Sequence, residues 1–128
     1  MQVVIAGQYP DASHLVGIPY SKKHCWQLCE QYYMDLLTVK LEYSVDFDTT
    51  DKSLSCSLIK ANKGDFVKVS KPERHDLIVI KIHGIECHIG VYLGSGLFLH
   101  TTKKTGSVVD RVGRWQNMIE GYYRYDSI

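Results

Sequence analysis

The sequence lacks long apolar runs and an excess of charge of either sign. No apolar run approaches the roughly 20 residues that a helix needs to cross a bilayer, so we expect no membrane insertion. Its 15 Lys and Arg residues nearly balance its 14 Asp and Glu residues, and the net charge is +1. Attraction to nucleic acid or anionic lipid requires clustered basic residues, which are absent. We therefore expect neither nucleic acid nor a membrane among the partners.

The sequence also lacks an export signal, internal repeats and low-complexity linkers. Residues 1–7 begin apolar, but they have neither the basic segment nor the long apolar stretch of a secretory signal. We therefore expect a protein made in a cytosol. With 128 residues, 45% of them hydrophobic, the composition is that of an ordinary globular protein. Nothing divides the chain, so a single domain over residues 1–128 is predicted.

Four cysteines are present, and without an export signal they are expected to be free thiols rather than disulfides. They are Cys25, Cys29, Cys56 and Cys87. Each is a candidate core residue, metal ligand or nucleophile, and their context must distinguish these roles.

The pattern of the chain changes from helical to extended along its length. Apolar side chains recur at helical spacing over residues 24–37, which predicts the strongest helix. Residues 40–64 are polar and mixed, and predict a surface loop with a short helix at 54–59. Strands are predicted at 77–82, 85–93, 97–101, 107–111 and 121–125, with a turn or short helix at 115–119. This order predicts an α+β fold in which the helix packs on one face of an antiparallel sheet.

Cys25 stands at the start of the predicted helix. Unpaired backbone N–H groups and the helix dipole favour an anion there. The preceding Lys22, Lys23 and His24 add positive charge, so we expect a lowered thiol pKa. Cys29 lies one turn later on the apolar face and is expected to be a core residue.

Two histidines are predicted to meet on neighbouring strands. Odd positions of residues 85–93 are apolar, so His88 points to the other face, together with Gly90. If residues 94–96 form a hairpin loop, Leu93 pairs with Leu97 and His100 falls beside Gly90. The two imidazoles then lie close enough to share a hydrogen bond. His88 would take the thiol proton and His100 would fix its tautomer. The other four histidines are expected on the surface: His14, His24, His75 and His83.

These residues resemble a known family of hydrolases. Residues 87–100, Cys-His-Ile-Gly-Val-Tyr-Leu-Gly-Ser-Gly-Leu-Phe-Leu-His, look like the His-x-Gly-x-Tyr-x-Gly-x-Gly-x-x-x-His stretch of NlpC-type cysteine peptidases. Residues 17–20 and 25–29 resemble that family's Pro-Tyr and Cys-x-x-Leu segments. Residues 76–80 resemble its Gly-Asp-hydrophobic strand, with His75 in place of the glycine. The resemblance covers roughly residues 14–125. It implies a papain-like α+β fold without a cofactor.

The resemblance also implies roles and a substrate. Cys25 would attack an amide carbonyl, with His88 as base and His100 as its orienting partner, and Tyr20 would be a second oxyanion donor. The substrate would be a peptidoglycan stem peptide. Residues 107–111, Trp115 and residues 122–124 further resemble the versions found in phage tail-tip assembly proteins. These would instead process a tail protein, contact other tail-tip proteins, and occur in the host cytoplasm and then the virion tail.

Two alternatives remain open. The first is a catalytically inactive tail component, because Tyr20 is followed only by Ser-Lys-Lys-His before Cys25. Family members commonly carry a Gly-Gly loop and an Asp in this segment. The second is a structural zinc site drawn from Cys25, Cys29, Cys87 and His88. Its spacings are poor for zinc, so no metal is expected.

Overall fold

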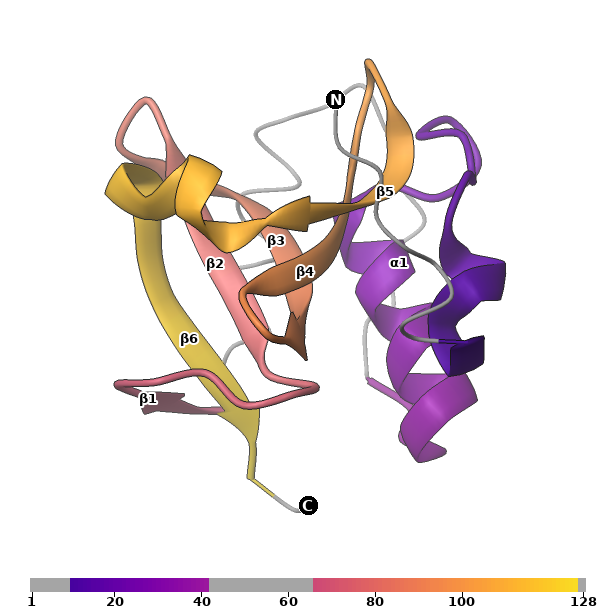
Figure 1. Ribbon diagram of the computed structural model, residues 1–128, viewed down its shortest axis with the longest axis horizontal. Coiled ribbons are helices and arrows are strands. Elements are labelled where there is room, and N and C mark those ends of the chain that lie inside the picture. The colour runs from indigo at the N-terminus through magenta and orange to yellow at the C-terminus, as the bar shows by residue number, and fades with distance from the viewer. Residues whose placement is uncertain (1–9, 42–65, 127–128) are drawn as a thin grey trace.

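The protein is described by a computed structural model that covers residues 10–41 and 66–126. A six-stranded antiparallel sheet, in the order β1-β6-β2-β3-β4-β5, forms its centre. One α-helix packs against β3 and β4 (Figure 1). The strands are β1 Phe66–Val69, β2 Leu77–Ile82, β3 Ile85–Gly94, β4 Leu97–Thr102, β5 Gly106–Arg111 and β6 Ile119–Tyr125. The predicted α+β class, with a helix on one face of the sheet, is confirmed.

The helix that carries the candidate nucleophile begins at its cysteine. α1 spans Cys25–Tyr32 and continues as a π-helical segment, η3, Tyr33–Leu37. Together they occupy the range predicted for the helix. The chain then leaves through Thr38, which has left-handed backbone angles. A 3-10 helix that the sequence did not indicate, η2, Pro10–Leu15, precedes α1.

The sheet combines a meander with a long return. Strands β2 to β5 follow one another as neighbours, as predicted, but β6 crosses back to pair with the outer side of β2. β1 then pairs with β6 at the edge. A second 3-10 helix, η5, Val112–Met118, joins β5 to β6. The predicted loop and short helix at residues 42–65 lie outside the described residues.

The sheet is covered on both faces, because β2 and its neighbours are apolar on both sides. Leu77, Val79 and Val91 belong to the core beneath α1. Ile78 and Phe98 belong to a second, smaller core that includes Val112 of η5 and, at its margin, Trp115. β3 and β4 therefore separate the helix from η5, as Figure 1 shows.

A buried ion pair fixes β6 beside β2. The Asp76 carboxylate is 2% exposed and accepts from Arg124 Nε at 3.0 Å and Arg124 Nη2 at 2.8 Å. The backbone N–H of Glu73 donates to the same carboxylate at 2.7 Å. A buried carboxylate is tolerated when it is paired in this way. Among the described residues, no helix has the length and apolar character needed to cross a membrane.

Candidate active site

Cys25 is the first residue of α1 and is 2% exposed. Its sulfur lies against the backbone N–H of Ile89 in β3, the residue that follows His88. The pairs between β3 and β4 run only from Gly94 opposite Leu97 to Val91 opposite Leu99. Ile89 lies beyond the last of these pairs. The start of α1 thus meets β3 where the strand is no longer paired with β4.

The expected low pKa of this thiol is contradicted. Burial raises the pKa of Cys25 to about 11, although the backbone N–H groups of Ile89, Trp26 and Cys25 itself act to lower it. Removal from water penalises the thiolate more than these N–H groups stabilise it. The resting site therefore holds a neutral thiol that must lose its proton as it reacts.

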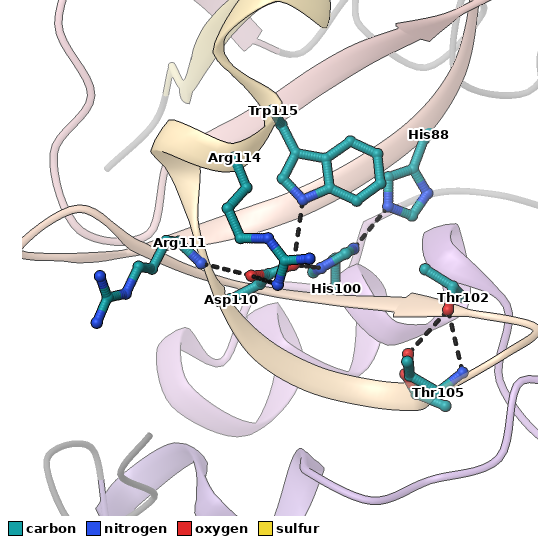
Figure 2. A network of polar contacts seen from close by, with 9 residues as sticks. His88, His100, Thr102, Thr105, Asp110, Arg111, Arg114 and Trp115 are labelled. Atoms are coloured by element: carbon teal, nitrogen blue, oxygen red, sulfur yellow. Dashed lines mark hydrogen bonds and ion pairs between the residues drawn. The ribbon is translucent and has the colours of Figure 1, made fainter. Parts of the chain in front are cut away.

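The two predicted histidines meet, as Figure 2 shows. His88 Nε2 and His100 Nδ1 are 2.8 Å apart, and both side chains are buried. The Trp115 ring stacks on His88 with centroids 5.6 Å apart, and Phe98 stacks on His100 at 4.4 Å. Burial, followed by the charge of His100, lowers the pKa of His88 to about 3. The imidazole of His88 is therefore neutral near neutral pH.

Asp110 extends this pair into a chain of three, and sequence reasoning missed it. Its Oδ2 accepts from His100 Nε2 at 3.1 Å and from Trp115 Nε1 at 3.1 Å. Its Oδ1 accepts from the backbone N–H of Arg111 at 2.8 Å and from Arg114 Nη1 at 3.2 Å. The feature that could have identified Asp110 is the β4–β5 register, which places it opposite Phe98, two residues from His100.

The chain fixes the tautomer of each ring. Burial lowers the pKa of His100 although Asp110 acts to raise it, and Asp110 has a lowered pKa and is ionised. A carboxylate only accepts hydrogen bonds, so the proton of a neutral His100 lies on Nε2. His100 Nδ1 then accepts from His88 Nε2–H. This leaves His88 Nδ1 as the ring nitrogen without a proton.

Gly90 makes room for this arrangement. A Cβ on Gly90 would lie 2.7 Å from the Leu99 carbonyl oxygen, 2.7 Å from Phe98 Cδ2 and 3.0 Å from His100 Cβ. The prediction that Gly90 frees space beside an imidazole is therefore confirmed for His100.

The hairpin between β3 and β4 differs from its prediction at the turn. Gly94, not Leu93, pairs with Leu97, and the register shifts between Tyr92 and Gly94. Ser95 and Gly96 both have positive φ, at 55° and 77°, as in a two-residue type I′ turn. The irregularity at Leu93 compensates for the shorter turn. It keeps Val91 opposite Leu99, which is the register expected near the site.

Tyr20 is half-buried in the loop that leads to α1. Burial raises its pKa to about 12, and the negative charge of a Cys25 thiolate contributes to the rise. The hydroxyl therefore keeps its proton and can donate a hydrogen bond.

Two of the four histidines expected on the surface are not there. His24 is fully buried and caps α1: its Nδ1 accepts from the backbone N–H of Gln27 at 3.4 Å, and Gln27 Oε1 accepts from the His24 N–H at 3.2 Å. Burial lowers the pKa of His24 to about 4, which keeps the ring neutral and Nδ1 able to accept. His75 is half-buried, with Nδ1 2.7 Å from the Tyr32 hydroxyl. His14 and His83 are exposed.

The thiol on the next turn of α1 has a different environment. Cys29 is buried in the core beneath the helix, as expected, and burial raises its pKa well above the usual value. Within residues 10–41 and 66–126, no three His, Cys, Asp or Glu side chains are grouped as metal ligands. The side chain of Cys87, one of the ligands weighed for zinc, lies outside the described residues.

A buried thiol at the head of a helix, next to a strand that carries linked imidazoles on an antiparallel sheet, is the arrangement expected of a papain-like fold. The NlpC/P60 family model matches residues 12–125, and the chain belongs to this family. This membership confirms the prediction of a cysteine peptidase of the NlpC type.

Two similar proteins agree with this family. Peptidoglycan DL-endopeptidase CwlO of Bacillus licheniformis is 33% identical over 64 residues, which are 48% of this chain and 14% of that protein. The chain thus spans a small part of that relative. The structure of the NlpC/p60 domain of peptidoglycan hydrolase SagA superposes with a TM-score of 0.60 at 17% identity, covering 94% of this chain and 97% of the other. At 17% identity, the likeness to the SagA domain shows a shared fold.

Proposed function

We propose that this protein cleaves an amide bond in peptidoglycan stem peptides, with Cys25 as the nucleophile. The observation that carries the proposal is the hydrogen-bonded series His88, His100, Asp110 beside the start of α1. The names of the two similar proteins, a peptidoglycan endopeptidase and a peptidoglycan hydrolase, favour this substrate.

The chemistry follows from the protonation states of the site. As Cys25 Sγ attacks the carbonyl carbon, its proton passes to His88 Nδ1, because a thiol with a raised pKa cannot ionise beforehand. His100 and Asp110 stabilise the imidazolium that forms. His88 then returns the proton to the leaving amine, and a thioester remains. Water, deprotonated by His88, attacks the thioester and releases the acid and the Cys25 thiol.

The oxyanion of each tetrahedral intermediate needs hydrogen-bond donors. The backbone N–H of Cys25 is one candidate, because the first N–H groups of a helix have no partner within it. The Tyr20 hydroxyl is the second candidate, since its raised pKa keeps it protonated next to a thiolate. Tyr20 is half-buried, so part of its side chain remains accessible to solvent.

The test compares two buried thiols of the same helix. Cys25→Ala should abolish release of peptide fragments from purified peptidoglycan, measured by liquid chromatography and mass spectrometry. Cys29→Ala removes an equally buried sulfur one turn away, and should keep most of the activity of the folded protein. Full activity of Cys25→Ala would refute the proposal. No activity in any variant, wild type included, would favour the inactive tail component.

A role in a phage tail tip is a second, finer proposal. It is supported by the resemblance of residues 107–111, Trp115 and residues 122–124 to tail-tip assembly proteins. In this case the protein would act in the host cytoplasm on a tail protein and would contact other tail-tip proteins, in the virion tail as well. Particle assembly with wild type and Cys25→Ala tests it: loss of tail processing or of infectivity supports the role. Normal particles formed without the protein would contradict it.

A further inference from the structure

Trp115, in η5, lies over the imidazole of His88. The indole ring is inclined by 28° to the plane of the His88 ring, with centroids 5.6 Å apart. It is nearly perpendicular to the His100 ring, at 81° and 5.3 Å. Figure 2 shows the indole beside both imidazoles. One aromatic side chain therefore contacts both histidines of the candidate site.

The indole is itself held by the carboxylate at the end of the chain of three. Trp115 Nε1 donates to Asp110 Oδ2 at 3.1 Å, and the same oxygen accepts from His100 Nε2 at 3.1 Å. The ring of Phe98 meets the indole edge-on, at 85° and 6.5 Å. Contacts therefore run in a closed cycle from His88 to His100, Asp110 and Trp115, and back to His88. The indole is fixed from more than one side.

The backbone of η5 brings Trp115 to this place. The helix begins at Val112, whose N–H donates to the Gly96 carbonyl at 2.9 Å and whose side chain is buried in the second core. Trp115 is half-buried, whereas Arg114 and Gln116 on either side of it are exposed. The packing of η5 thus directs the indole inward and its two neighbours to solvent.

His88 needs a contact of this kind to keep one orientation. Among the residues that the structure describes, its ring has one hydrogen-bond partner, His100 Nδ1 at 2.8 Å. One hydrogen bond through a single nitrogen leaves a planar ring free to tilt about that bond. A nearly parallel aromatic ring limits this freedom, because a tilt would separate the stacked faces. The orientation of a proton-transferring group matters, since a displacement of about 1 Å can cost roughly 100-fold in rate.

We propose that Trp115 is a positioning residue for the amide cleavage: anchored on Asp110, its ring holds the His88 imidazole in the orientation required for proton transfer. The inference rests on the proposed function for the reaction itself, and on the stacking geometry for the role of Trp115. Trp115 acts through His88 and not on the substrate. It should therefore affect kcat and the mobility of the His88 ring, and leave KM nearly unchanged.

The kinetic test uses two variants of Trp115 and one matched control. Trp115→Leu removes the aromatic face and should lower kcat on a stem peptide roughly 10- to 100-fold, with KM within about twofold of the wild type. Trp115→Phe keeps an aromatic face but lacks the N–H group, and should restore kcat to within about fivefold of the wild type. Tyr122→Leu is the control, because Tyr122 also packs at the margin of the second core. It should lower the stability of the protein but keep the kcat of the wild type.

A spectroscopic measurement reports on His88 without any substrate. The Nε2–H proton that His88 shares with His100 should exchange slowly with water, because both side chains are buried. Followed by ¹H–¹⁵N NMR, this exchange should be at least about tenfold faster in Trp115→Leu. It should stay at the wild-type rate in Trp115→Phe and Tyr122→Leu. If Trp115→Leu does not fold, Trp115→Met replaces it in both assays, because a flexible thioether fills the space without an aromatic face.

The outcomes separate this role from simple packing and from the catalytic proposal. An unchanged exchange rate in Trp115→Leu overturns the inference whatever the kinetics. So does an equal loss of kcat in Trp115→Leu and Tyr122→Leu, or a loss that appears in KM instead of kcat. A kcat of Trp115→Phe as low as that of Trp115→Leu also contradicts it. If the wild type cleaves no stem peptide, the proposed function fails, and the exchange rates alone then decide whether Trp115 positions His88.

Discussion

Asp110→Asn is the substitution that tests the tautomer chain most directly. The carboxylate of Asp110 accepts from four donors, two on each oxygen. An asparagine has one acceptor oxygen and one NH2 group, so it must turn its NH2 group toward one pair of donors. If the NH2 group faces His100 Nε2, both imidazoles change tautomer and His88 Nδ1 carries a proton. If it faces Arg111 and Arg114, two donors lose their acceptor.

The expected magnitude follows from the hydrogen bond between His100 Nε2 and Asp110 Oδ2, 3.1 Å long and formed where His100 is 1% exposed. A hydrogen bond to a charged group contributes about 1.5–3 kcal/mol. Each 1.36 kcal/mol of transition-state stabilisation is about a factor of ten in rate. Because Asp110 acts through His100, we expect kcat to fall roughly 10- to 100-fold. KM should change less than about twofold, since Asp110 would not touch the substrate.

Kinetics on a stem-peptide substrate and ¹⁵N NMR of the histidine rings measure this effect together. In the wild type, both His88 and His100 should carry their proton on Nε2. Arg114→Gln is the control, because it removes only an exposed partner of Asp110 and should reduce kcat less than about threefold. The reasoning would be refuted if Asp110→Asn kept the kcat of the wild type. It would also be refuted if the spectrum of the wild-type protein showed the His88 proton on Nδ1.

Three further predictions concern the thiol, the helix cap and the crowded glycine. With a pKa of about 11, Cys25 should react with iodoacetamide about tenfold faster per pH unit between pH 7 and 10, and a plateau below pH 8 would contradict this. The pKa of His24 is lower in the folded than in the unfolded protein, so acid lowers the free energy of unfolding. His24→Asn keeps a helix cap, and in urea unfolding it should reduce this pH-dependent loss of stability by about 1.4 kcal/mol per pH unit between pH 6 and 4.5. An unchanged dependence of the free energy of unfolding on pH would disprove the role of the neutral His24 cap. Gly90→Ala should lower the free energy of unfolding by roughly 1–3 kcal/mol, whereas Gly113→Ala, with open space at its Cβ, should cost less; equal costs would count against the close contact.

Local patterns in the sequence were sufficient for α1, for the strands β2 to β6 and for the two imidazoles, but not for η2 or β1. The period of two over β3 separated His88 from the aliphatic residues, and the short turn that follows brought His100 beside it. These relations depend on neighbours within about a dozen residues. The family resemblance added Tyr20 and the expected chemistry as predictions, and the chain belongs to that family.

Relations across longer distances were inaccessible to the same reasoning. β6 pairs with β2, and Arg124 reaches the buried Asp76 at the end of this pairing, a contact between residues 48 positions apart. His24 was expected on the surface because nothing local shows that the loop before α1 is covered. The loop before α1 lies beside the start of β5 because residues 17–18 bond to Ser107, nearly 90 positions away.

The sequence by itself determined where the thiol and the imidazoles stand in their elements, because side-chain direction in helices and strands follows from backbone geometry. Only the tertiary structure decided how these groups ionise and what they contact. The thiol pKa rises because packing of α1 on the sheet removes Cys25 from water, which outweighs the favourable helix start. Asp110 joins the site because β5 pairs with β4 in one particular register. Burial and register depend on the whole chain, so no local pattern contains them.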